Sequence, residues 1–165
     1  MSTAAASEIV IVIPGIPQPA GSKRSFIVKG KGGGRDRAVT VDANKKQKSW
    51  QLVVRECAME LCTHHWEMPA FLGPVEVSVS FRFPRPKYHY GSGKNARIVK
   101  KTAPCYCSTK PDLDKLLRAL NDSLTGIVWR DDSQVVCFNE VAKIYTVGPG
   151  EAIVRVRPLA PTESL

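Results

Sequence analysis

Apolar and polar residues alternate without a break over residues 75–83, and this pattern limits the fold more than any other. Successive side chains of a β-strand point to opposite faces, so a period of two predicts a strand with one buried face. Such a strand needs neighbouring strands and a second layer over its apolar face. The alternation therefore predicts a sheet that is covered on one side.

Two segments have the helical spacing that could supply this cover. In the first, which Asp42 can cap, apolar residues recur every three or four positions from Trp50 to about Cys62. In the second, leucines repeat at the same spacing from Leu113, and Gly126 is a suitable C-terminal stop. Both patterns indicate amphipathic helices.

The remaining strands and loops complete the expected architecture. Strands are predicted at 9–13, 38–41, 134–147 and 152–156. We expect a single α+β domain over residues 1–165, in which two main helices cover a mixed β-sheet. Flexible tails are expected at 1–7 and 158–165, and basic loops at 22–37 and 84–110.

The charge is distributed unevenly. Residues 1–110 hold 18 Lys and Arg against 7 Asp and Glu, whereas residues 111–165 hold 6 against 8. A strongly basic body favours a polyanionic partner, with nucleic acid first and an anionic membrane surface second. The chain has no apolar run long enough for a membrane span and no signal-peptide core at its start, so we expect a cytoplasmic protein.

An acidic stretch interrupts this basic chain. Asp112 and Asp114 flank the predicted start of the second helix, and Asp131 and Asp132 follow its end. If the chain turns back at Gly126, an extended return of about 20 Å would compensate for about 18 Å of helix and bring the two pairs together. Clustered carboxylates could then hold Mg²⁺ for phosphodiester cleavage.

A simpler interpretation of the same acids remains open. Asp112 or Asp114 could cap the helix and interact favourably with its dipole, while Asp131 and Asp132 could be turn residues before a strand. Composition and spacing alone do not choose between these alternatives.

The segment from Pro111 to Asp122, together with Gly126 to Val136, resembles the signature of the RusA family of Holliday junction resolvases. This family occurs in bacteria and in phages and prophages. The dense part of the match includes Trp-x-Asp-Asp-x-Gln-Val, and weaker similarity extends to the amino-terminal Ile-Pro-Gly-Ile-Pro and to Lys143. The resemblance implies a RusA-like fold and a structure-selective endonuclease.

Site roles follow from this resemblance position by position. Asp112, Asp114 and Asp132 match the catalytic carboxylates that would hold Mg²⁺, with Mn²⁺ as a substitute, and Asp131 becomes a supporting metal-site acid. The catalytic lysine of the family falls on Arg118, which is a departure. Arginine can bind a phosphate but cannot donate a proton at ordinary pH. The alternative for Arg118 is an ion-pair ladder with Asp114 and Asp122.

The basic segments are expected to contact DNA phosphates and to position the duplex without reading its sequence. The predicted DNA-binding residues are Lys23, Arg24, Lys29, Lys31, Arg35, Arg37, Arg85, Lys87, Lys115 and Lys143. Aromatic residues at 88–90 could stack on exposed bases, although packing is the more common role of such residues.

Taken together, the resemblance implies a homodimer that makes paired, symmetric nicks in four-way DNA junctions. It implies no membrane association and no small-molecule cofactor. Two alternatives are a non-enzymatic nucleic-acid-binding module, in which the acids only cap and turn, and a related metal nuclease acting on other branched DNA.

Overall fold

The alternating segment forms the centre of a four-stranded sheet with the order β1-β6-β4-β5. The strands are β1 (Ile9–Pro14), β4 (Val75–Pro84), β5 (Val135–Thr146) and β6 (Glu151–Pro158). Strand β6 pairs antiparallel with both β1 and β4, whereas β4 and β5 are parallel. Every second residue of β4 is buried, from Val75 to Phe83, as a sheet covered on one face requires.

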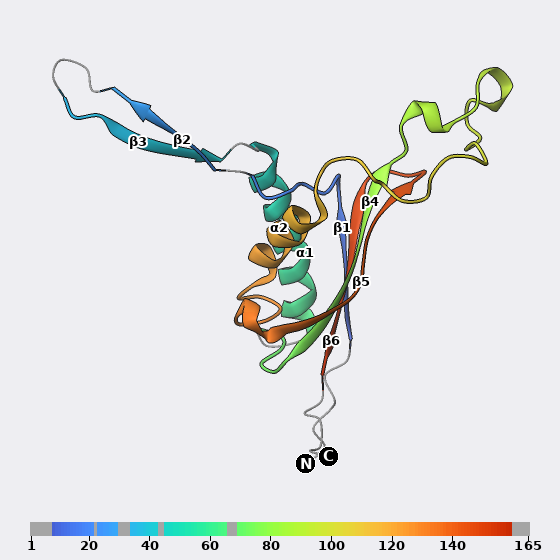
Figure 1. Cartoon of the computed structure of the whole chain (residues 1–165). Coiled ribbons are helices and arrows are strands. Elements are labelled where there is room, and N and C mark those ends of the chain that lie inside the picture. The colour runs from blue at the N-terminus through green and yellow to red at the C-terminus, as the bar shows by residue number, and fades with distance from the viewer. Residues whose placement is uncertain (1–7, 22, 30–33, 43–44, 66–68, 160–165) are drawn as a thin grey trace, which may run out of the picture.

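Helices α1 (Lys45–His65) and α2 (Leu113–Leu124) cover one face of this sheet in the computed structural model shown in Figure 1. The structure describes residues 8–21, 23–29, 34–42, 45–65 and 69–159. The apolar stripe of α2 is buried at Leu116, Ala119, Leu120 and Leu124, because these residues recur on one face of the helix.

A two-stranded ribbon projects from this body (Figure 1). It consists of β2 (Lys23–Val28) and β3 (Arg37–Asp42), which pair antiparallel with each other and, in the part of the chain that the structure describes, with no other strand. A hairpin without a third strand or a packed helix has little stability of its own in water. We therefore expect the ribbon to gain stability when it contacts another molecule.

A second projection lies at the same end of the molecule (Figure 1). It follows β4 and contains the short 3₁₀ helices η2 (Lys87–His89) and η3 (Gly93–Asn95). The chain then returns to the sheet, where Tyr106 forms a β-bridge with Ile144 of β5. This return brings the chain to the start of α2.

The predicted fold class is confirmed, since the protein is an α+β domain in which two helices cover a mixed sheet. The sequence-based strands and helices all exist, with ends displaced by a few residues. Among the described residues, no helix combines the length and apolar character needed to cross a membrane.

Candidate active site

Asp112 and Asp114 lie at the amino-terminal end of α2, and both are exposed. Asp112 has an extended backbone and occupies the N-cap position, yet its carboxylate makes no capping hydrogen bond. The Asp112 side chain therefore does not cap the helix, contrary to the simpler interpretation. Asp114 lies in the first turn, where the helix dipole favours a negative charge.

Lys115 is the closest cationic partner of this pair. Its Nζ lies 2.9 Å from Oδ2 of Asp112, and both side chains are about half exposed. The hydrogen bond from Lys115, its charge and the charges of Lys110 and Lys143 hold the pKa of Asp112 below its usual value. The pKa of Lys115 is raised by Asp112 first and also by Asp114. Lys115 therefore pairs with Asp112 and offsets part of the negative charge of the two carboxylates.

Asp132 lies at the opposite end of α2. Its Oδ1 accepts a hydrogen bond from the hydroxyl of Thr125, the C-cap residue of α2, and another at 3.3 Å from Nε1 of Trp129. The indole of Trp129 is fully buried and also contacts Thr125 Oγ1 at 3.1 Å. A buried aromatic residue thus fixes the position of the Asp132 carboxylate.

Gln134 holds the loop that carries Asp131 and Asp132. Its side-chain oxygen accepts hydrogen bonds from the backbone N–H groups of Arg130 at 2.7 Å and Asp131 at 3.0 Å. Its amide nitrogen donates to the carbonyls of Phe71 at 3.2 Å and Gly73 at 2.9 Å. Asp131 accepts a hydrogen bond from the backbone of the following turn, η4 (Asp132–Gln134), as its N-cap. The turn role considered for Asp131 is therefore confirmed.

The two acidic pairs do not meet within one chain. Helix α2 has 12 residues, which corresponds to a separation of about 18 Å between its ends. From the Asp132 end, β5 runs back along the sheet and brings Lys143 beside Pro111 at the other end of α2. The expected convergence of Asp131 and Asp132 on Asp112 and Asp114 is therefore wrong for a single chain. Among the described residues, no three His, Cys, Asp or Glu side chains gather as a metal site would require.

Arg118 lies one helical turn beyond Asp114 and is exposed. Within the described part of the chain, Arg118 forms no ion pair with Asp114 or Asp122, so the proposed ladder is not found. Its guanidinium is available to an external anion at the surface that also carries Asp114.

The predicted DNA-binding residues fall into three groups. Arg37 is exposed in β3, Lys29 and Arg35 are exposed next to the paired ends of β2 and β3, and Lys87 is exposed on the second projection. The side chains of Lys23, Arg24 and Lys31 lie outside the described residues. The third group makes internal contacts instead, and its members are Arg85, Lys115 and Lys143.

Arg85 and the neighbouring aromatic residues anchor the base of the second projection. Arg85 donates a 2.7 Å hydrogen bond to the carbonyl of Pro104, and its guanidinium lies 5.7 Å from the centre of the Tyr145 ring. His89 is buried and packs edge-on against Tyr145. Tyr88 is exposed, although its ring contacts His89 edge-on, and this exposure is compatible with stacking on a base.

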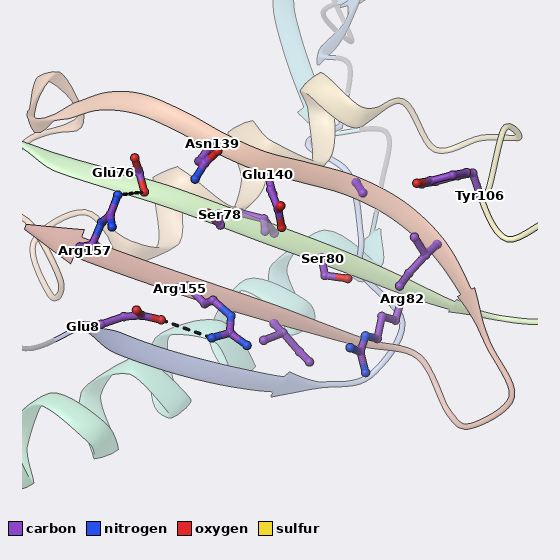
Figure 2. Close-up of a pocket in the computed structure, with 14 residues that line it drawn as sticks. Glu8, Glu76, Ser78, Ser80, Arg82, Tyr106, Asn139, Glu140, Arg155 and Arg157 are labelled. Carbon is purple, nitrogen blue, oxygen red and sulfur yellow. Dashed lines mark hydrogen bonds and ion pairs between the residues drawn. The ribbon is translucent and has the colours of Figure 1, made fainter.

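The face of the sheet away from the helices contains a shallow concavity of about 620 Å³ (Figure 2). Two ion pairs cross it, Arg155 with Glu8 at 3.4 Å and Arg157 with Glu76 at 2.8 Å. None of the predicted site residues lines this concavity. This concavity is therefore separate from the acidic pair at the start of α2.

Comparison with known proteins identifies the family. The model of the family described as "Endodeoxyribonuclease RusA" matches residues 17–157, which is most of the chain. The chain therefore belongs to the RusA family of endodeoxyribonucleases, whose activity is the resolution of Holliday junctions. It is also 30% identical over 141 residues to "Uncharacterized protein YqaN" of Bacillus subtilis (strain 168), covering 86% of this chain and 90% of that protein.

The roles of Thr125, Gln134 and Lys143 in holding the acidic segments were not found by sequence reasoning. Gln134 and Trp129 belong to the Trp-x-Asp-Asp-x-Gln-Val motif, so the motif itself carried a signal for them. The contacts of Thr125 with Trp129 and Asp132 form across the turn that follows α2, and no sequence pattern marks them. The contact of Lys143 with the backbone beside Asp112 joins residues 32 positions apart, so it depends on the tertiary fold.

Proposed function

We propose that the protein is a magnesium-dependent resolvase of four-way DNA junctions that works as a homodimer and makes paired, symmetric nicks. One observation supports this most strongly: Asp112 and Asp114 lie exposed at the start of α2, at the end of the molecule from which both basic segments project. Carboxylates mark a place for a cation, and the projections can bind the phosphates around it.

Asp112 and Asp114 suit Mg²⁺ in their chemistry. This ion takes hard oxygen ligands and is often held by one or two carboxylates together with waters and substrate phosphates. When bound, it would activate a water and neutralise charge on the scissile phosphate, and Mn²⁺ could replace it. Lys115 must release Asp112 for this, which leaves the ammonium of Lys115 free to contact the phosphate. Arg118 would hold the same phosphate through two parallel hydrogen bonds, without transferring a proton.

The simplest way for Asp132 to reach this site is from a second copy of the chain. If two copies pair about a two-fold axis with their α2 helices antiparallel, Asp132 of each copy approaches Asp112 and Asp114 of the other. The exposed positions of Asp114, Arg118 and Asp132 on and beside α2 support this arrangement. Two equivalent sites would follow, as two symmetric nicks need, with Asp131 holding its loop rather than ligating the ion directly.

The direct test is a cleavage assay on a labelled four-way junction and a linear duplex of the same sequence. We expect Mg²⁺-dependent nicks at symmetric positions in the junction only, and their loss on addition of EDTA. Binding without nicking in Mg²⁺ or Mn²⁺ would contradict the proposal and favour a binding module. Equal cleavage of both substrates would contradict junction selectivity.

A further inference from the structure

We propose that Lys143 is a positioning residue that fixes the segment leading into Asp112, in place of the phosphate contact expected from the sequence. The inference rests on the proposed function, since it takes Asp112 as a ligand of the metal. Lys143 lies on β5, an edge strand of the sheet, and its side chain is half-buried.

The ammonium of Lys143 is bonded to the backbone immediately before Asp112. Its Nζ lies 2.7 Å from the carbonyl oxygen of Thr109 and 2.6 Å from that of Pro111. A lysine ammonium has three N–H donors, so these two carbonyls leave one for any other partner. A phosphate could reach only the third donor while Lys143 holds this backbone.

The backbone of Lys143 holds the same segment at a second point. Its carbonyl accepts a 2.9 Å hydrogen bond from the N–H of Cys107, while the neighbouring Tyr145 N–H donates to Cys105 at 2.8 Å. The segment is thus tied to β5 at Cys105 and Cys107 by main-chain bonds, and at Thr109 and Pro111 by the Lys143 side chain. Asp112 is the first residue after the last of these contacts.

The other side of Asp112 is held by the helix. The carbonyl of Asp112 accepts a 3.2 Å hydrogen bond from the N–H of Leu116, and the carbonyl of Lys115 accepts one from Ala20 at 2.9 Å. Asp112 therefore lies between the helix start and a segment that is anchored to β5. Without the Lys143 side chain, the main-chain bonds to β5 would end at Cys107, and the backbone at Thr109 and Pro111 would lose its contact with that strand.

This geometry matters because Mg²⁺ requires nearly octahedral ligands at short distances. Residues that orient metal ligands typically change metal affinity by about 10–100-fold when they are replaced. A positioning lysine and a phosphate-binding lysine therefore predict losses in different measurements, one in metal affinity and the other in DNA affinity.

The test compares Lys143→Met, which keeps the length of the side chain but has no donor, with Lys143→Arg and Lys29→Met. Metal affinity is measured by calorimetry with Mn²⁺ in the absence of DNA, and by the Mg²⁺ dependence of cleavage. Junction affinity is measured in EDTA at several salt concentrations, and thermal unfolding shows that each variant is folded.

For Lys143→Met we expect about a 10-fold or greater loss of Mn²⁺ affinity, with junction affinity within about twofold of the wild type and the same salt dependence. Lys143→Arg should recover most of the metal affinity, because a guanidinium can donate to two carbonyls. Lys29→Met should show the reverse: unchanged metal affinity, weaker junction binding and a salt slope smaller by about one.

If Lys143→Met instead behaves like Lys29→Met, or like the wild type in both measurements, the positioning role is wrong. If Lys143→Met does not fold, Lys143→Arg decides the question. The positioning role is then wrong if Lys143→Arg binds Mn²⁺ much more weakly than the wild type. Absence of cleavage by the wild type contradicts the proposed function alone, because the Mn²⁺ titration without DNA still decides the role of Lys143.

Discussion

Replacing Gln134 with leucine tests how the loop of Asp131 and Asp132 is held. The substitution keeps the approximate size of the side chain and removes four hydrogen bonds to backbone groups, with lengths of 2.7, 3.0, 3.2 and 2.9 Å. Each such bond contributes about 0.5–1.5 kcal/mol net, and the lower part of this range applies here because water can replace some of them. We therefore expect a loss of about 2–4 kcal/mol in the free energy of unfolding.

Urea unfolding followed by circular dichroism measures this loss, and thermal unfolding should shift down by roughly 2–4 °C for each kcal/mol. Gln51→Leu is the matched control, since Gln51 makes only one hydrogen bond to the backbone, a 3.2 Å donation to the carbonyl of Ala119, and accepts one long bond of 3.4 Å from the Gln47 side chain among the described residues. The control should lose about 1 kcal/mol or less. If the two variants were equally stable, the structural role assigned to Gln134 would be refuted.

Three further predictions concern the acids and the basic ribbon. Asp114→Asn should abolish junction cleavage while junction binding in EDTA persists or tightens, because a negative charge near the phosphate is removed; wild-type cleavage would exclude Asp114 from the site. The depressed pKa of Asp112 means that its ion pair with Lys115 contributes stability above the unfolded-state pKa and loses it as pH falls through the folded-state value. Lys115→Met should therefore shift the carboxyl titration of Asp112 to higher pH in a ¹³C NMR experiment, and an unchanged titration would argue against the ion pair. Replacing Lys29, Arg35 and Arg37 together with alanine should lower the salt slope of junction binding by about 2–3 units. A smaller change would indicate that DNA binds elsewhere on the protein.

The sequence was sufficient to predict elements whose pattern is local. The period of two over residues 75–83 gave β4 because alternation alone determines which face is buried. The leucines after Asp112 recur every three or four residues, and this helical period predicted α2 and its buried face. The exposure of Asp112 and Asp114 at the start of α2 followed directly from their position relative to that stripe.

The path of the chain after α2 could not be predicted in this way. The turn at Gly126, which has a φ of 83°, was expected, but the direction of the chain after it was not. Burial of the Trp129 indole and the hydrogen bonds from Gln134 to Phe71 and Gly73 keep the loop at the carboxyl end of the helix. These partners are more than 50 residues away in the sequence, so spacing alone allowed a return that the tertiary contacts prevent.

The central claim is that Asp112 and Asp114 form a site with Asp132 of a second copy, and a mixed dimer tests it most directly. Asp114→Asn and Asp132→Asn, carrying different affinity tags, are co-expressed, and the heterodimer is purified and assayed on a four-way junction. Each variant alone should be inactive, whereas the heterodimer retains one complete site and should nick one strand at the wild-type position. A heterodimer as inactive as its parents, with undiminished junction binding, would contradict the shared site.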